Sequence, residues 1–180
     1  MRAAAGILLA ALLPLAAVAQ EDHMVHDETA LEPSAACAAP EPVLRYGWKE
    51  NIRIETQTQY LELVAKLDTG ADTSSLHATN VVVYELGGQN WVRFNVDGRQ
   101  LEQPVVRRAL IKQKGAEPQE RWVVRLDLCV GKTYFPADFS LVDRSEFSTP
   151  ALLGRDALEQ LGPVDPGIRF TVEPRCAALQ

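Results

Sequence analysis

The chain has 180 residues, a hydrophobic fraction of 47% and a formal net charge of −6 at pH 7. This length and apolar content suffice for the core of one ordinary domain. No basic stripe with interleaved aromatic residues is present, so nucleic acid is not an expected partner. Much of the acidity lies between residues 20 and 45, where six acidic residues accompany a single basic one, Arg45.

The N-terminus carries a targeting signal. Met1-Arg2 precedes an apolar run from Ala3 to Ala19 that ends in small residues. This pattern is typical of a secretory signal peptide over residues 1–19, and the alternative is an uncleaved anchor. No later segment is apolar enough to span a membrane, so we expect no membrane span after cleavage and a periplasmic or secreted location. Residues 20–44, rich in Ala, Glu and Pro, are expected to form a flexible acidic tether.

The rest of the chain has an all-β pattern. Short segments rich in β-branched and aromatic residues predict strands at 52–58, 60–67, 81–86, 91–96, 105–111, 122–130, 133–142 and 168–172. Gly87-Gly88 and Asp97-Gly98 separate such segments and favour hairpin turns, which indicates an antiparallel meander. One short helix is expected from Arg155 to Leu161, stopped by Gly162-Pro163. No internal repeat is present.

The chain has three cysteines, Cys37, Cys129 and Cys176. In an exported protein, three cysteines indicate a disulfide rather than a metal site, with one thiol left over. Three pairings are possible, and we favour Cys129 with Cys176.

Two sequence signatures indicate chemistry. Leu67-Asp68-Thr69-Gly70-Ala71 follows an apolar strand, and Leu152-Leu153-Gly154-Arg155-Asp156 lies near the end of the chain. An Asp-Thr-Gly turn can aim its carboxylate into a cleft, although an ordinary turn has the same sequence. Peptide hydrolysis without a metal or a covalent intermediate needs two carboxyl groups that share one proton. The chain has a single Asp-Thr-Gly, so the second carboxylate must come from elsewhere.

These runs resemble the retropepsin family of aspartic peptidases. The similarity is strongest at residues 68–72 and 152–162. In detail the chain is most similar to a bacterial retropepsin-like group often labelled ATP-dependent zinc proteases, through residues 66–71, 91–94 and 143–145. The resemblance covers roughly residues 45–173 and leaves 174–180 as a C-terminal tail. It implies a single-lobe, retropepsin-like barrel with one short C-terminal helix.

The resemblance also implies roles for individual residues. Asp68 would be the catalytic carboxylate, the Thr69 hydroxyl would bond across to the partner's loop, and Gly70 would allow close approach. Ala71, Asp72, Gly154 and Arg155 would support the site. Asp72 and Arg155 match an ion pair that ties the active-site loop to the terminal helix, and loss of one member of such a buried pair costs roughly 3–5 kcal/mol.

Residues 106–124 are the candidate for the hairpin flap with which retropepsins cover their substrate. The residues singled out in this candidate flap are Lys112, Gly115 and Trp122. The alternative is an ordinary exposed hairpin. The hairpin around Trp91 is an insertion relative to the shorter retroviral chains.

Other catalytic chemistries find little support in the sequence. Neither a His-Glu-x-x-His zinc motif nor a phosphate-binding Gly-x-x-x-x-Gly-Lys-Ser/Thr loop occurs, so we expect no cofactor and no metal. His23 and His26 lie in the tether and could hold a metal only weakly. His77 is expected to pack or to form hydrogen bonds behind the active-site turn, and Ser74 and Ser75 are expected to form hydrogen bonds within their loop.

These observations predict an exported aspartic endopeptidase that cleaves a peptide or protein substrate. It would act as a homodimer in which each subunit supplies Asp68. The alternative is a non-catalytic binding or scaffolding domain of the cell envelope with the same fold, because a fold does not establish an activity.

Overall fold

The computed structural model describes residues 43–56, 60–111 and 117–176. In this part of the chain there is one helix, α1 (Arg155–Leu158), and no helix is long and apolar enough to cross a membrane. The strands are β1 (Tyr46–Gly47), β2 (Lys49–Glu55), β3 (Tyr60–Leu67), β4 (Ser74–His77), β5 (Thr79–Leu86), β6 (Gln89–Val96), β7 (Arg99–Ile111), β8 (Gln119–Val130), β9 (Thr133–Val142), β10 (Ala151–Leu153) and β11 (Val164–Asp165).

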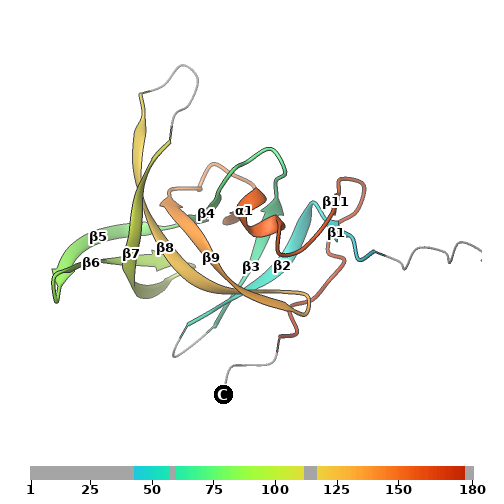
Figure 1. The fold of residues 1–180 in the computed structure, drawn as a ribbon, viewed down its shortest axis with the longest axis horizontal. Helices are drawn as coiled ribbons and strands as arrows, with labels where there is room; N and C mark the ends of the chain where they lie inside the picture. The colour runs from blue at the N-terminus through green and yellow to red at the C-terminus, as the bar shows by residue number, and fades with distance from the viewer. Residues whose placement is uncertain (1–42, 57–59, 112–116, 177–180) are drawn as a thin grey trace, which may run out of the picture. The chain divides into compact units, whose positions relative to one another are not determined.

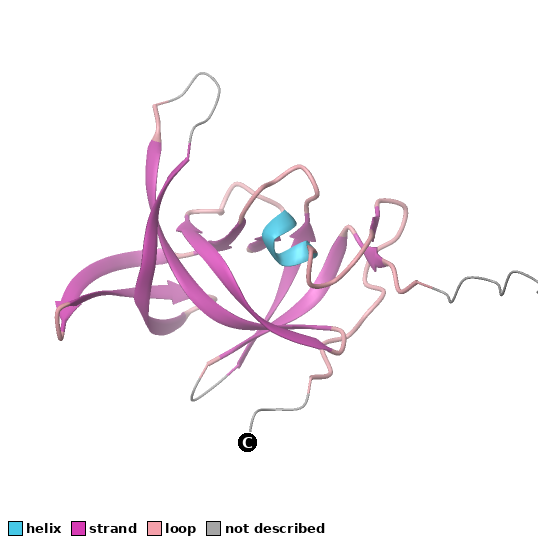
Figure 2. Ribbon diagram, viewed as in Figure 1, coloured by secondary structure: helices cyan, strands magenta, loops and turns pink. Residues whose placement is uncertain are grey.

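Six strands form a closed barrel in the order β2-β3-β10-β4-β9-β8, because β2 also pairs with β8. Figure 2 shows that strands make up most of the described chain. Buried and more exposed residues alternate along β2 and β3, as expected of strands with one face toward a core. The interior is filled by apolar side chains that include Ile52, Ile54, Leu61, Ala65, Leu76, Leu128, Phe139 and Leu153. The predicted all-β barrel is therefore confirmed.

Beyond the barrel, β7, β6 and β5 continue the sheet from β8 (Figure 1). The β5–β6 hairpin and the distal part of the β7–β8 hairpin project away from the barrel. Gly87 and Gly88 have positive φ angles of 62° and 78°, and Asp97 and Gly98 have 50° and 74°. The predicted hairpin turns and the antiparallel meander of β5 to β9 are thus confirmed.

Several boundaries differ from the prediction. β7 begins at Arg99 instead of residue 105, and α1 ends at Leu158, after which hydrogen-bonded turns continue to Gly162. The short strand β4 was not predicted, and β10 was indicated only by the apolar residues of the second signature. Both have parallel neighbours in the barrel, β9 for β4 and β3 for β10.

The strand predicted at residues 168–172 is wrong. This segment runs beside β1 and β2, but Phe170 has a positive φ of 54°, and the segment is not a strand. Part of its backbone forms hydrogen bonds with a buried side chain and not with a neighbouring strand. The fully buried carboxyl group of Glu50 accepts hydrogen bonds from the backbone N–H groups of Gly47, Thr171 and Val172 and from the Thr171 hydroxyl, at 2.5–3.2 Å. Glu50 therefore fixes the C-terminal segment to the barrel.

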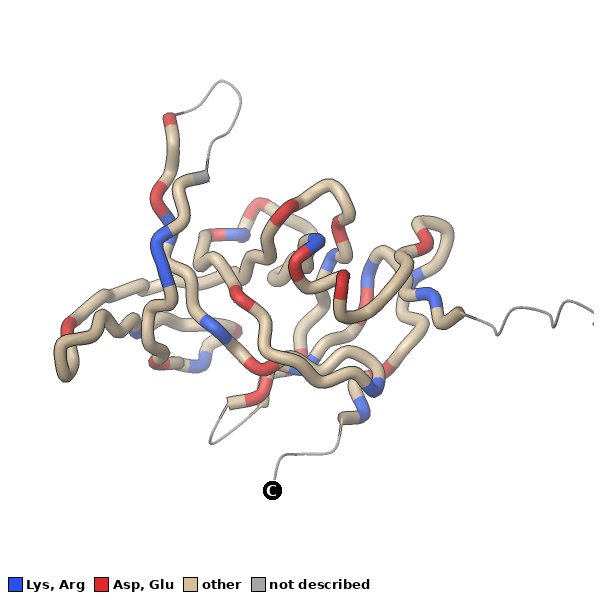
Figure 3. Tube along the Cα trace, viewed as in Figure 1, with Lys and Arg blue, Asp and Glu red and all other residues tan. Residues whose placement is uncertain are grey.

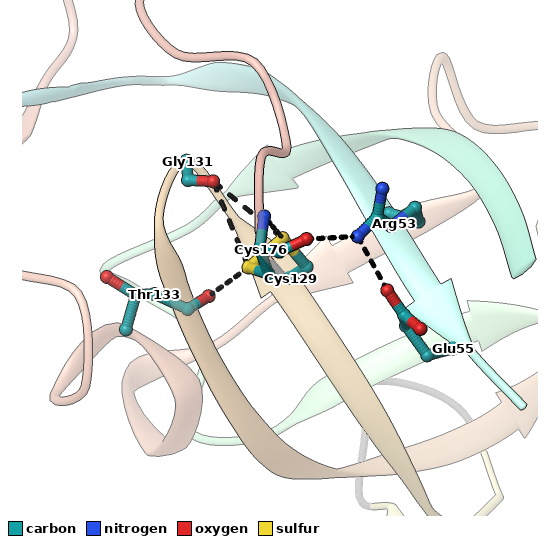
Figure 4. A network of polar contacts seen from close by, with 6 residues as sticks. All are labelled: Arg53, Glu55, Cys129, Gly131, Thr133 and Cys176. Atoms are coloured by element: carbon teal, nitrogen blue, oxygen red, sulfur yellow. Dashed lines mark hydrogen bonds and ion pairs between the residues drawn. A yellow bond between two sulfur atoms is a disulfide. The ribbon is translucent and has the colours of Figure 1, made fainter. Parts of the chain in front are cut away.

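A disulfide anchors the same segment further along. Cys129 of β8 and Cys176 are joined, as predicted, and their Cα atoms are 5.9 Å apart. Figure 4 shows that Arg53 reaches this point from β2, where it donates a 2.8 Å hydrogen bond to the Cys176 carbonyl and pairs with Glu55 at 2.6 Å. The remaining cysteine, Cys37, lies outside the described residues.

Replacing Glu50 tests its anchoring role. Glu50→Gln preserves the shape of the side chain but turns an amide donor toward a group of N–H donors. We expect the free energy of unfolding to fall by about 2 kcal/mol or more, since buried donors lose their acceptor. Urea denaturation measures this change. Glu62→Gln on the exposed face of β3 is the matched control and should change stability by less than about 0.5 kcal/mol. Equal effects of the two substitutions would contradict the anchoring role.

Candidate active site

Asp68 lies directly after β3, in a tight turn. Its backbone N–H donates to the Leu153 carbonyl at 2.9 Å, and its own carbonyl accepts from the Ala71 N–H at 3.2 Å. Its carboxylate has two donors: the Gly70 N–H at 3.0 Å from Oδ1 and the Lys66 ammonium at 2.8 Å from Oδ2. The hydrogen bond from Lys66 is the main reason that the pKa of Asp68 lies below its usual value, and partial burial opposes it. The carboxylate is thus oriented and held in its ionised form.

The two signatures meet at this turn because β10 pairs in parallel with β3, with Leu153 opposite Leu67. Gly154 follows immediately and packs against the backbone of Thr73. A Cβ atom at Gly154 would lie 2.6 Å from the Thr73 carbonyl carbon, closer than any real contact. Only glycine therefore allows the second signature to lie so close to the first.

Behind the turn, a partly buried hydrogen-bond network joins β4 to α1. The Ser74 hydroxyl donates to Asp156 Oδ1 at 2.8 Å and accepts from the Gly154 N–H at 3.1 Å, and the Ser74 N–H donates to Asp156 Oδ2 at 3.2 Å. The Ser75 hydroxyl accepts from Arg144 at 2.8 Å. Both serines form hydrogen bonds, as predicted, although they lie on a buried strand and not in a loop. The part played by Asp156 was not predicted.

Arg155 connects α1 to the outer side of the turn. Its guanidinium donates to the Thr69 carbonyl at 3.0 Å and pairs with the Asp72 carboxylate. The predicted pairing of Asp72 with Arg155 is present, but its expected burial is wrong, since the two side chains are 80% and 51% exposed. An exposed pair contributes only about 0–1 kcal/mol. Thr69 is itself exposed, and the bond of its hydroxyl to a partner loop stays a prediction.

A cavity of about 620 Å³ lies beside the turn, between residues 71–73 and the β7–β8 hairpin. It is lined by four arginines: Arg107, Arg108, Arg121 and Arg144. Consecutive residues of a strand normally point to opposite faces, yet Arg107 and Arg108 both line this cavity. The register of β7 against β8 shifts between Val105 and Arg107, and such irregularities re-aim side chains. Blue segments on these hairpin strands in Figure 3 mark this concentration of positive charge.

Arg144 and Arg121 are the most constrained of the four. Arg144 is 6% exposed and donates to the Thr149 carbonyl and the Ser75 hydroxyl. Its pKa is lowered by burial and by the charge of Arg121, while the negative charge of Asp68 opposes the shift. Burial also lowers the pKa of Arg121, whose Nε is buried without a hydrogen-bond partner in the described structure. The cavity is therefore lined mainly by cations, although Arg108 pairs with Glu120 at 3.3 Å and Asp72 also lines it.

None of these four arginines was assigned to the site from the sequence. The adjacent pair Arg107-Arg108 was available as a signal, as was Arg144 within the run 143–145 that resembles the bacterial group. A second cavity, about 450 Å³ in volume, is lined by Tyr46, Gly131 and residues 170–173. That cavity does not include the Asp68 turn.

The proposed flap corresponds to the β7–β8 hairpin. Lys112 and Gly115 lie outside the described residues, and Trp122 is half-buried on β8 with the Arg108 guanidinium 5.5 Å from its ring centre. The hairpin stands next to the arginine-lined cavity, since Arg107, Arg108 and Arg121 belong to it. Its action as a flap stays a prediction.

The histidine expected behind the turn forms a hydrogen bond there. His77 Nδ1 accepts from the Arg144 N–H at 2.8 Å and lies 3.4 Å from Asp143 Oδ1. Residues 43–56, 60–111 and 117–176 contain no cluster of three His, Cys, Asp or Glu side chains suited to a metal. His23 and His26 lie outside these residues.

Comparison with known protein families gives one match that covers most of the chain. The family profile described as the retropepsin-like aspartic endopeptidase RimB matches residues 45–175. This match includes the Asp68 turn, the second signature and the strands of the barrel.

Individual similar proteins fall into two groups. A protein of unknown function from Legionella pneumophila, Lpg0085, has a crystal structure that superposes with a TM-score of 0.61 at 35% identity, covering 71% of this chain and 97% of that one. Proteins named probable alpha-L-glutamate ligase match from Desulfotalea psychrophila, 29% identical over 58% of this chain, and Parasynechococcus marenigrum, 34% identical over 57%. In both ligases the match spans 24% of the relative's length, so this chain corresponds to about a quarter of each.

Proposed function

The chain belongs to the family of retropepsin-like aspartic endopeptidases, and we propose that it hydrolyses peptide bonds with a water molecule activated by two Asp68 side chains, one from each subunit of a homodimer. The observation that carries this proposal is the geometry of Asp68. Its carboxylate is held by donors on both oxygens in a turn whose outer residues, Thr69 and Gly70, are exposed. A second copy could approach the carboxylate from that side.

The proposed chemistry uses one proton shared by two carboxyl groups. The ionised group removes a proton from water while the water oxygen attacks the peptide carbonyl carbon. The protonated group donates to the carbonyl oxygen, which gives a neutral gem-diol. Transfer of a proton to the amide nitrogen then accompanies cleavage of the C–N bond. Two like charges so close together resist joint ionisation, which maintains the shared proton.

The arginine-lined cavity supports a preference for acidic substrates. Arg144 and Arg121 are desolvated cations that lie close enough to repel each other, and an incoming carboxylate would relieve this repulsion. Guanidinium groups also match carboxylates in geometry, so bidentate hydrogen bonds add specificity. The similar proteins named as glutamate ligases suggest the same substrate chemistry. We therefore infer that peptides with acidic side chains next to the cleaved bond are preferred.

Two alternatives compete with this function. A non-catalytic domain of the cell envelope would keep the fold without cleavage, but it would have no need of a catalytic carboxylate kept ionised and accessible. Ligase activity is suggested only by the names of longer proteins of which this chain matches about a quarter.

Export of the protein remains part of the proposal. The apolar run of residues 3–19 lies outside the described structure, and its interpretation as a signal peptide rests on its sequence pattern. The disulfide between Cys129 and Cys176 supports an oxidising compartment such as the periplasm or the exterior of the cell.

Removing the carboxylate tests the catalytic proposal directly. Asp68→Asn conserves the shape of the side chain and should reduce cleavage of a fluorogenic peptide by several orders of magnitude, because neither proton transfer can occur. A chelator should leave the wild-type rate unchanged. Asp138→Asn on β9, which pairs with Arg125 outside the site, is the matched control and should retain activity. Substantial turnover by Asp68→Asn would disprove the aspartic mechanism.

Dilution tests the two-chain site. A monomer presents one Asp68, so specific activity should fall as the protein is diluted below the dissociation constant of the dimer and should return on concentration. Arg155→Ala should move this transition to higher concentration, because Arg155 orders the exposed Thr69–Asp72 loop. Sedimentation measured across the same dilution series identifies the species. A verified monomer that cleaves at the full rate would exclude the two-chain site.

Paired substrates test the preference for acidic peptides. Arg121→Gln should lower kcat/KM for a peptide with Glu beside the cleaved bond by about tenfold or more, since a charge-assisted hydrogen bond contributes about 1.5–3 kcal/mol. The corresponding Gln peptide should be affected much less. Arg125→Gln, on the same strand but outside this cavity, is the control. If the two peptides respond equally to Arg121→Gln, the cavity does not select for charge.

A further inference from the structure

Lys66 and Asp68 form a pair within a single chain that the shared-proton chemistry does not require. Residues two apart on a strand point to the same face, and β3 continues in this sense up to the turn. The result is the 2.8 Å contact between Lys66 Nζ and Asp68 Oδ2, with the two side chains 43% and 25% exposed. Lys66 therefore occupies the carboxylate oxygen that the Gly70 N–H leaves open.

The neighbouring strands favour this contact. On β2, Lys49 stands directly opposite Lys66, and two like charges at such positions repel. Lys49 is directed to the ring of Trp48, 4.7 Å from its centre, while Lys66 is directed to Asp68. On the other side of β3 the residue opposite Lys66 is the apolar Leu152 of β10. Asp68 is thus the nearby carboxylate that is geometrically available to Lys66.

The other charged groups around the turn are already engaged. Arg155 binds Asp72 and the Thr69 carbonyl, Asp156 binds Ser74, and Arg144 binds Ser75 and the Thr149 carbonyl. Arg144 interacts with Asp68 only through its long-range charge. Lys66 is therefore the cation in direct contact with the proposed catalytic oxygen atoms.

We propose that Lys66 is a positioning residue that fixes the orientation of Asp68 and sets the pH range over which the carboxyl pair carries a single proton. This inference rests on the proposed aspartic mechanism. An ammonium group beside a carboxylate stabilises the ionised form. In a dimer it lowers the pH at which the pair takes up its second proton, and also the pH at which the pair loses its last one. Lys66 thus shifts the entire active range toward acidic pH.

The pH dependence of kcat/KM tests this role. Lys66→Met should move both limbs of the bell-shaped profile to higher pH, by about one unit, because a neighbouring opposite charge lowers a carboxyl pKa by about 1–3 units. Lys66→Arg, which keeps the charge, should restore most of the wild-type profile. Lys49→Met removes a charge from the opposite strand position and should leave the profile in place. Each variant is assayed at a concentration where sedimentation shows the wild-type species.

Two results would overturn the inference. The first is a pH profile of Lys66→Met with both limbs unchanged. The second is an equal shift of the profile in Lys66→Met and Lys49→Met, which would indicate an effect of general surface charge. If Lys66→Met folds poorly, carbon NMR titration of the Asp68 carboxyl in Lys66→Gln and in wild-type protein measures the same shift. Failure of the underlying mechanism is distinguishable, because Asp68→Asn would then remain active. If Asp68→Asn is inactive and the pH profile of Lys66→Met is unshifted, the aspartic mechanism stands and only the proposed role of Lys66 is refuted.

Discussion

The parallel pairing of β10 with β3 is the contact on which the site depends. Leu152 and Leu153 stand beside Lys66 and Leu67, and the Leu153 carbonyl accepts the Asp68 N–H. This pairing inserts β10 between β3 and β4 and allows the barrel to close. It also places Gly154 against Thr73 at a distance that excludes a Cβ atom. Barrel closure and the conformation of the Asp68 turn therefore depend on the same strand pairing.

The charge around the Asp68 turn differs in sign from the net charge of −6 of the whole chain. The acidic residues near the N-terminus contribute much of that value, whereas the cavity beside Asp68 is lined by four arginines. The local field is therefore positive. Of these arginines, Arg144 interacts with the negative charge of Asp68, whereas the pKa of Asp68 is lowered mainly by the hydrogen bond from Lys66.

The sequence predicted the features that depend on local patterns. Alternation identified β3 and β9 with their observed bounds, and the glycine pairs identified the hairpin turns. β4 was missed because its residues, Ser74 to His77, are mostly polar, and their burial is possible only through partners distant in sequence such as Asp156 and Arg144. β10 has only three residues, too few for a periodic signal. The strand expected at 168–172 failed because the buried Glu50 takes the N–H groups of Thr171 and Val172.

The residues around the Asp68 turn were found from two short signatures, which named Asp68, Gly70, Gly154 and the pairing of Asp72 with Arg155. The structure brings these residues together, and the catalytic role of Asp68 stays a prediction. The arginine cavity could not be found this way, because its members come from β7, β8 and the loop after β9. They converge through the pairing of β7 with β8 and through the packing of the buried Arg144 behind the Asp68 turn. Sequence patterns report which residues share an element, whereas a cavity is defined by how elements meet.

The inner side of the Asp68 turn is held by hydrogen bonds and its outer side is exposed to solvent. This difference bears on the proposed function. Ser74, Gly154 and Asp156 hold the inner side through hydrogen bonds that are buried or partly buried, while Thr69, Gly70 and Asp72 are exposed. In a single chain, Lys66 is the only side chain that contacts the Asp68 carboxylate among the described residues, so the carboxylate remains ionised and has no acid to act with it. In the dimer proposed above, a second carboxyl group that arrives at the open face would compete with Lys66 for Asp68. The strength of the lysine contact would then set both the protonation of the carboxyl pair and the free energy needed to assemble it.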